Sequence, residues 1–239
     1  YVGYEDCNDN DAESTYREID GDCDGAIAGA DCDDENPALG SSEADPDCDG
    51  IYPPHYTDVT AGRYHSCGLY NNGRLACWGS NSYGQLNVPT NGGQPYTGWA
   101  SVSTDRYANC GIHSGGTLEC WGDGYPVNYA PGSNSADGGV SVSDEWSAVS
   151  VGYSHGCGLH SNGLMTCWGQ NWYGQNNIPT NDGEAYTDWQ AVSVGDYHSC
   201  GLRQDGRLEC WGANGSGETN VPTNDGEPYT DWVAVSAAS

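Results

Sequence analysis

The chain has 239 residues, a formal net charge of −28 and 12 cysteines, and it is rich in Trp and Tyr but lacks Phe. Nucleic acids and anionic membranes are bound by clustered Lys and Arg, and the six basic residues here argue against both partners. An even number of regularly spaced cysteines favours disulfides, which form in oxidising compartments. We therefore expect a secreted or cell-surface protein without membrane insertion, because no stretch approaches the roughly 18 apolar residues of a spanning helix.

The acidic residues are concentrated at the start of the chain. Residues 1–50 hold 17 of the 34 Asp and Glu residues and only one of the six Arg, and Pro53-Pro54 follows this change in composition. We predict two domains: an acidic, loop-rich, disulfide-linked segment over 1–52, and a domain rich in Gly, Trp and Tyr over 53–239.

Within the acidic segment, the run DGDCDGAIAGAD has the spacing of a calcium-binding loop. Alternate carboxylates on a tightly turned backbone can converge on one hard cation, so we expect this segment to bind Ca²⁺. No amphipathic helices flank the run, so a paired EF-hand domain is not expected. The ligands at loop positions 1, 3, 5, 7 and 12 are Asp20, Asp22, Asp24, the carbonyl of Ala26, and Asp31. Similar acidic runs add the candidate ligands Asp6, Asn8, Asp33, Asp45, Asp47 and Asp49.

The same segment repeats with a period of 25 residues, so that Cys7 corresponds to Cys32 and Cys23 to Cys48. Four cysteines allow three pairings, and the period favours Cys7–Cys23 and Cys32–Cys48. The run DCDDENPALGSSEADPDCDG resembles the Asp/Cys calcium-binding repeats of thrombospondins and of bacterial surface proteins. That resemblance implies short acidic loops that wrap calcium ions and are held by disulfides. A disordered acidic linker is the alternative.

The chain from residue 56 onward is a tandem repeat. Similar phrases begin at His65, Ala108, His155 and His198, of which the second is diverged. The last cysteine of each copy follows that of the preceding copy by 43, 47 and 43 residues. A strand-like run precedes each copy, and a fifth such run covers residues 232–236. We predict about four short strands in each unit.

Each copy predicts a β-hairpin whose three-residue loop ends in glycine. In a regular hairpin the two cysteines of a copy face each other beside an aliphatic pair such as Leu69 and Leu75, and the Trp that follows the second cysteine points to the opposite face. The register predicts the disulfides Cys67–Cys77, Cys110–Cys120, Cys157–Cys167 and Cys200–Cys210.

The pattern G-x-x-H-S-C-G-L … G-x-L-x-C-W-G-x-N-x-x-G-Q-x-x-V-P resembles the repeats of the regulator of chromosome condensation superfamily. It is nearest to the short-repeat bacterial branch that includes the propeller β-lactamase inhibitor protein. The resemblance implies an all-β fold of β-propeller-type repeats, with four recognisable blades and a terminal strand, whereas these relatives usually have seven blades. The ring could close through the last strand, continue in a longer parent chain, or pair with another subunit.

The loops between units place Tyr and acidic side chains on one rim, where they suit recognition of a protein or a surface glycan. The alternative is that the Asn, Asp and Gly residues of these loops only form turns and that the tyrosines pack between blades. The candidate rim residues are Tyr96, Glu184, Tyr186, Asp188, Glu227, Tyr229 and Asp231. We also expect copies of the chain as possible partners, through the terminal strand.

The sequence carries no nucleophile motif, no phosphate-binding loop and no free cysteine, so we expect no enzyme. The recurring histidines are interpreted as hydrogen-bonded structural residues, because the diverged copy has Ala108 at that position. We predict a calcium-stabilised scaffold for protein interaction, adhesion or assembly of an extracellular structure such as a filament. The alternatives are a soluble inhibitor of a secreted enzyme and a carbohydrate-binding propeller. The charge and the disulfides oppose a chromatin or nucleotide-exchange role.

Overall fold

The computed structural model describes residues 55–131 and 145–237. The chain divides into two units, Tyr1–His55 and Tyr56–Ser239, and every described strand belongs to the second. The predicted calcium ligands and the cysteines Cys7, Cys23, Cys32 and Cys48 lie outside the described residues. Within the described ranges, no helix is long and apolar enough to cross a membrane.

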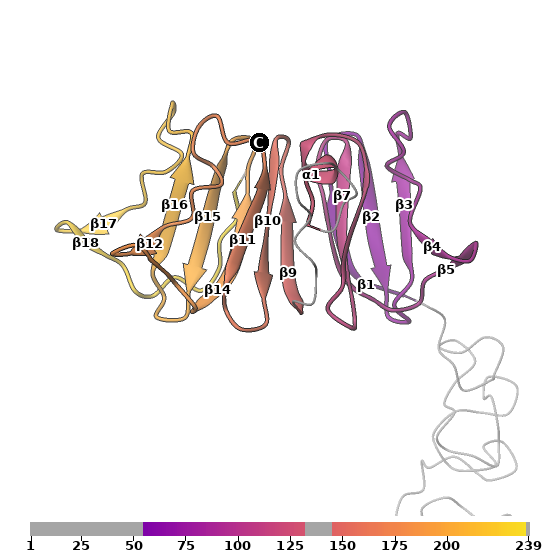
Figure 1. Ribbon diagram of the computed structural model, residues 1–239, viewed down its shortest axis with the longest axis horizontal. Coiled ribbons are helices and arrows are strands. Elements are labelled where there is room, and N and C mark those ends of the chain that lie inside the picture. Colours follow the sequence, from indigo (N-terminus) through magenta and orange to yellow (C-terminus); the bar gives the residue numbers. More distant parts are fainter. Residues whose placement is uncertain (1–54, 132–144, 238–239) are drawn as a thin grey trace, which may run out of the picture. The chain divides into compact units, whose positions relative to one another are not determined.

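The second unit contains four antiparallel three-stranded sheets that follow one another in chain order (Figure 1). We call each sheet with its following loop a blade. Blade 1 contains β1 (Tyr56–Ala61), β2 (His65–Tyr70) and β3 (Leu75–Gly79); blade 2 contains β6 (Trp99–Thr104), β7 (Ala108–His113) and β8 (Leu118–Gly122). Blade 3 contains β9 (Trp146–Val151), β10 (His155–His160) and β11 (Met165–Gly169); blade 4 contains β14 (Trp189–Val194), β15 (His198–Arg203) and β16 (Leu208–Gly212). The described part is thus nearly all β, as predicted, with one short helix, α1 (Tyr125–Asn128).

The prediction of four strands in each unit is wrong, because the segment after the third strand forms a loop. In blade 1 the side chain of Asn81 donates to Asn87 Oδ1 at 3.1 Å and accepts from the Leu86 amide at 2.8 Å. Such side-chain bonds compete with a strand ladder. Separate two-residue hairpins follow in three blades: β4 (Thr90–Asn91) with β5 (Gln94–Pro95), β12 (Thr180–Asn181) with β13 (Glu184–Ala185), and β17 (Thr223–Asn224) with β18 (Glu227–Pro228).

The predicted hairpin register is confirmed in all four blades. In blade 1, Leu69 lies opposite Leu75 and Cys67 opposite Cys77. The loop closes through Gly73, whose φ of 74° is a left-handed conformation that glycine adopts without strain. The four disulfides formed are Cys67–Cys77, Cys110–Cys120, Cys157–Cys167 and Cys200–Cys210.

The hydrophobic core lies between neighbouring blades. Each blade has two faces. We call the face with the disulfide and the aliphatic pair the outgoing face, and the face with two Trp residues the incoming face. The incoming faces of blades 2, 3 and 4 each cover the outgoing face of the blade before. Between blades 1 and 2, Cys67 and Leu69 pack against Trp99, Val102 and Trp121. Equivalent clusters join blades 2 and 3 and blades 3 and 4.

A buried hydrogen bond accompanies each of these clusters. The indole of Trp121 donates to the Gln85 carbonyl of the preceding blade at 3.0 Å, and Trp211 donates to the Gln175 carbonyl at 2.8 Å. Trp168 makes the same kind of bond to a preceding carbonyl. Trp121, Trp168 and Trp211 therefore bury their apolar rings and satisfy their polar N–H groups.

The first strands of successive blades are linked by hydroxyl groups. A Ser or Thr hydroxyl of each first strand accepts from a backbone N–H one blade further along. The four bonds are Thr104 N to Thr60 Oγ1 (3.3 Å), Val151 N to Ser103 Oγ (3.1 Å), Val194 N to Ser150 Oγ (3.0 Å) and Ala237 N to Ser193 Oγ (2.8 Å). We call these first strands the inner strands.

Candidate functional site

The predicted rim residues lie on the loops that lead into the inner strands. The ring of Tyr186 meets Trp189 edge-on, with centroids 5.7 Å apart, and the Arg203 guanidinium lies 3.7 Å from the Tyr186 centroid. Arg203 also donates to both oxygens of Asp188, and these bonds raise the pKa of Arg203. The structure thus brings Tyr186 and Asp188 together around a shared Arg.

The other rim residues vary in exposure. Tyr96 packs on Trp99 and His113, and Tyr229 meets Trp232 edge-on. The side chains of Glu184, Glu227 and Asp231 are exposed to solvent. The tyrosines therefore contribute to packing at the blade junctions, and binding of a partner by this rim stays a prediction.

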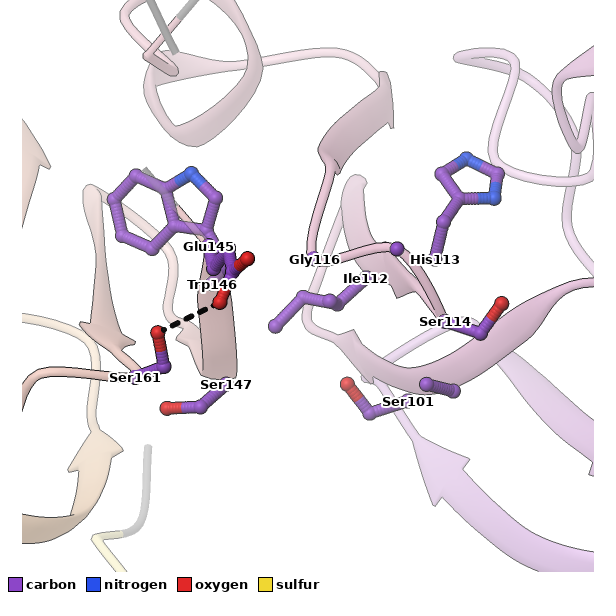
Figure 2. Close-up of a pocket in the computed structure, with 11 residues that line it drawn as sticks. Ser101, Ile112, His113, Ser114, Gly116, Glu145, Trp146, Ser147 and Ser161 are labelled. Carbon is purple, nitrogen blue, oxygen red and sulfur yellow. Dashed lines mark hydrogen bonds between the residues drawn. The ribbon is translucent and has the colours of Figure 1, made fainter. Parts of the chain in front are cut away.

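A hollow of about 330 Å³ lies on the same rim between blades 2 and 3. Figure 2 shows Ser101, His113 and Ser114 of blade 2 facing Glu145 and Ser161 across it. The hydroxyl of Ser161 donates to Glu145 at 3.3 Å. The lining offers small hydroxyls and one carboxylate, which suits hydrogen bonding to a polar group.

The opposite side of the blades carries a surface rich in aromatic side chains, which the sequence reasoning missed. It is formed by the turns between the first and second strands and by the loops after the third strands. In Figure 1 it lies along the upper edge, where α1 is drawn. We call this surface the aromatic face; it comprises Tyr64, Tyr83, Tyr107, Tyr125, Tyr129, Tyr153, Trp172, Tyr173 and Tyr197.

The rings of the aromatic face contact one another across blades. Tyr107 of blade 2 lies 5.8 Å from Tyr64 and 4.5 Å from Tyr83, both of blade 1, between ring centroids. Tyr197 of blade 4 lies 5.5 Å from Tyr173 of blade 3. Trp172 is 74% exposed, the largest exposed fraction among the described aromatic residues. These rings therefore form a preorganised surface in contact with water.

Charged residues lie among these rings around a cavity of about 380 Å³. Arg106 lies 4.2 Å from the ring centroid of Tyr153 and 3.9 Å from an Asp196 oxygen. Arg63 and Asp105 also line the cavity. One oxygen of Asp105 is buried without a hydrogen-bond partner among the described residues, and burial raises the pKa of this carboxyl. The cavity thus offers two guanidinium groups and two carboxyl groups.

Two of the three histidines that recur at the start of the second strands, His65 and His155, are buried between blades. His65 Nε2 lies 2.7 Å from Asn109 Oδ1, and His155 Nε2 lies 2.7 Å from Ser199 Oγ. Their interpretation as structural residues is confirmed at these two positions. Within residues 55–131 and 145–237, no group of three or more His, Cys, Asp or Glu is placed to hold a metal ion.

A family model, described as the regulator of chromosome condensation (RCC1) repeat, matches residues 56–85, 146–175 and 189–218. The chain carries regulator of chromosome condensation repeats. The three RCC1 matches begin in blades 1, 3 and 4, and the structure shows that the diverged segment between the first two folds into the same three-stranded sheet. The comparison with curated proteins gave no significant match.

Several solved structures resemble the RCC1 repeats of this chain. The ectodomain of the Physcomitrella patens receptor kinase CR4 is 26% identical, with a TM-score of 0.52, over 77% of this chain and 45% of that one. Prp20p from Saccharomyces cerevisiae, described with its binding to Gsp1p and histones, is 14% identical, with a TM-score of 0.56, over 76% and 50%. Human WBSCR16 is 17% identical, with a TM-score of 0.59, over 78% and 56%. The chain thus spans about half the length of these structures, and the two at lower identity show the fold alone.

The sequence did contain a signal for the aromatic face. Tyr64, Tyr107 and Tyr197 occupy one position of the repeat, just before the second strand, and Tyr83 and Tyr173 share another. Tyrosines that recur at the turn after each inner strand could have indicated that successive blades form one aromatic surface. Only the loops between units were considered as a binding surface.

Proposed function

We propose that this chain is a secreted or cell-surface scaffold that binds a partner protein through the aromatic face. The observation that carries this proposal is the aromatic face itself, where exposed rings such as Trp172 and Tyr173 share one surface with Arg63 and Arg106. Tyr, Trp and Arg are the residues that dominate binding energy at protein interfaces. A rigid ring loses little conformational entropy on binding, and the ring contacts between blades already fix these side chains.

Two features support an extracellular location. Four cross-strand disulfides, one in each blade, form and persist in oxidising compartments. The CR4 structure, at 26% identity, is a receptor kinase ectodomain. In this setting, calcium ions would neutralise the acidic segment 1–52 and order its loops.

The net charge of the chain indicates which kind of protein it would bind. A chain with a net charge of −28 attracts basic partners over long range and repels acidic ones. The two guanidinium groups of the aromatic face add local sites for carboxylates or for aromatic rings. We therefore expect a basic protein whose contact surface contains acidic or aromatic side chains. A secreted enzyme with a basic cleft is one such partner, in which case the scaffold would act as an inhibitor.

The test compares variants of the two sides of the blades. The full chain, immobilised in calcium-containing buffer, is used to capture proteins from the secreted fraction of its source, and each captured protein is purified for direct titration. The variant Trp172→Ala/Tyr173→Ala should weaken binding at least about tenfold, since an interface Trp commonly contributes more than 1–2 kcal/mol. The control Tyr229→Ala, on the opposite rim, should leave binding unchanged.

Two results would contradict the proposal. If the rim variant weakens binding and the Trp172→Ala/Tyr173→Ala variant does not, the partner uses the rim loops. If no protein is captured and a glycan array instead gives hits that the aromatic variant loses, the surface binds carbohydrate.

A further inference from the structure

The turns between the first and second strands of the four blades share one backbone but differ in one side chain. Each turn has three residues, and the amide of its first residue donates to the carbonyl of the first residue of the second strand at 2.9–3.0 Å. The third residue is Tyr in blades 1, 2 and 4. Because the same backbone bond closes every turn, the fold does not specify the middle side chain. The middle residues of blades 1 to 4 are Arg63, Arg106, Tyr153 and Asp196.

These four middle residues converge on one cavity. Arg63, Arg106 and Asp196 line the cavity of about 380 Å³ on the aromatic face. The Arg106 guanidinium lies 4.2 Å from the ring centroid of Tyr153 and 3.9 Å from an Asp196 oxygen. Residues that the fold leaves free to vary and that surround one cavity are those with which a protein sets its binding specificity. The middle side chains therefore determine what this cavity can bind.

Blade 2 also departs from the other blades at the first position of its turn. Blade 2 has Asp105 at this position, and the other blades have Gly62, Gly152 and Gly195. A side chain on Gly62 would meet the Asp105 carbonyl oxygen, so glycine lets neighbouring turns approach closely. Asp105 breaks this local rule and adds a carboxyl group to the lining of the cavity, which indicates a functional rather than a structural role.

The two guanidinium groups of the cavity have free hydrogen-bond donors. Arg63 is exposed and forms no ion pair within the described residues, where its guanidinium lies 5.5 Å from the ring centroid of Tyr64. Arg106 Nε is buried without a hydrogen-bond partner among those residues, and the 3.9 Å contact with Asp196 is too long for a hydrogen bond. Each guanidinium carries five N–H donors. Since one oxygen of Asp105 is buried, the cavity offers more free donors than free acceptors.

We propose that this cavity binds a carboxylate of the partner protein, on an Asp or Glu side chain, through the guanidinium groups of Arg63 and Arg106. The carboxylate site rests on the proposed function, because the cavity lies in the aromatic face, and it specifies the group that the partner inserts there. A planar guanidinium pairs with a carboxylate through two parallel N–H···O bonds. The contact with the Tyr153 ring holds the Arg106 guanidinium in place, so less conformational entropy is lost on binding.

The charges around the cavity select against other ligands. Asp105 and Asp196 repel a phosphate group, which carries nearly two negative charges, more strongly than a carboxylate, which carries one. Arg63 and Arg106 repel a Lys or Arg side chain of the partner. A partner that is basic overall is attracted by the chain as a whole, and its one acidic side chain pairs with the cavity in a single orientation. The cavity thus sets the orientation and the specificity of binding, while the net charge sets the long-range attraction.

The test uses the full chain in calcium-containing buffer and two small probes of the same shape. Benzoate carries a carboxylate, and benzamide has a neutral amide in its place. Benzoate should shift the side-chain Nε–H signals of Arg63 and Arg106 in NMR spectra. It should also bind about tenfold or more tightly than benzamide, because charge-assisted hydrogen bonds are about twice as strong as neutral ones. Added salt should reduce this preference by screening the charges.

Paired substitutions connect the preference for benzoate to the cavity. The variant Arg63→Gln/Arg106→Gln should abolish the preference, so that the two probes bind equally weakly. The control Arg74→Gln/Arg207→Gln removes the same charge at equivalent positions directly after the hairpin loops of blades 1 and 4, and should keep the preference of wild type. Benzoate that binds wild type no more tightly than benzamide, or a preference that survives Arg63→Gln/Arg106→Gln, would overturn the proposal.

Binding of the captured partner protein separates the carboxylate site from the proposed function. The variant Arg63→Gln/Arg106→Gln should weaken this binding about tenfold or more. If it does not, and Trp172→Ala/Tyr173→Ala does, the partner uses the aromatic face without a carboxylate in the cavity, and only the carboxylate site is overturned. If wild type prefers benzoate and Trp172→Ala/Tyr173→Ala binds the partner as wild type does, the carboxylate site is supported and the proposed binding by the exposed rings is wrong.

Discussion

His155 is fully buried between blades 3 and 4, where its Nε2 meets the Ser199 hydroxyl. Burial and, secondarily, the charge of His198 lower the pKa of His155 from 6.5 to about 4. As the pH falls, the His155 imidazole is therefore protonated near pH 6.5 in the unfolded chain but only near pH 4 in the folded chain. We predict that this residue removes about 3 kcal/mol from the free energy of unfolding as the pH falls through this window, and nothing more below it.

Urea unfolding at a series of pH values checks this prediction. The variant His155→Gln keeps a polar side chain beside Ser199 but does not titrate, so its stability should fall less steeply between pH 6.5 and about 4. Replacement of the exposed His55 by Gln serves as the control and should leave the slope of wild type unchanged. Equal slopes in wild type and His155→Gln would show that the buried imidazole is not the group responsible.

The sequence could predict which residues pair with each other within one hairpin. The pairs Cys67–Cys77 and Leu69–Leu75 follow from a two-residue alternation and a three-residue loop, which are local rules. The bond from Trp121 to the Gln85 carbonyl joins residues 36 apart in neighbouring blades, and no local rule places them together. The aromatic face was missed for a different reason: its tyrosines do recur at fixed positions of the repeat, but only the loops between units were considered as a binding surface.

At the scale of single elements, each disulfide stabilises the hairpin whose two strands it joins. Each disulfide joins cysteines 10 residues apart, and closing a loop of this size stabilises the folded state by roughly 2.5–3 kcal/mol in the chain-entropy model. Cys157 is fully buried and packs in the core cluster between blades 3 and 4. We predict that Cys157→Ala/Cys167→Ala lowers the free energy of unfolding by about this amount, measured by urea unfolding.

The matched variant Cys67→Ala/Cys77→Ala removes the disulfide that closes a loop of the same length in blade 1. Because the entropy of loop closure depends on loop length, it should lose a similar amount. A much smaller loss in both variants would mean that the hairpins are already ordered in the unfolded chain.

The number of strands in each unit is the part of the fold that was predicted wrongly from the sequence. About four short strands were expected in each unit, and three form a sheet. After the Trp-Gly pair of blade 1, Asn81 binds Asn87 and the Leu86 amide in place of a further strand ladder. Asn, Gly and Ser in that run favour such local bonds, and this preference was the available signal against a strand.

At the scale of the whole molecule, charge is the dominant property, and half of the acidic residues lie in residues 1–50. Carboxylates packed at this density repel one another, so ordering of the segment requires a counter-ion. We predict that EDTA makes residues 1–52 sensitive to protease while the four blades stay resistant, because the predicted ligands all lie in the segment. Limited proteolysis with mass spectrometry of the fragments, with and without Ca²⁺, measures this.

Substitutions make the calcium prediction specific to the loop. The variant Asp20→Asn/Asp22→Asn removes two charges at the first two ligand positions, so it should need a higher calcium concentration for protection. The control Asp182→Asn/Asp225→Asn removes the same charge from the turns of two rim hairpins and should respond to calcium like wild type. Protection of the segment by Mg²⁺ or by salt alone would indicate general screening, since a calcium loop of this size selects the larger ion. Protease sensitivity that is the same with EDTA and with Ca²⁺ would exclude a structural calcium site in the segment.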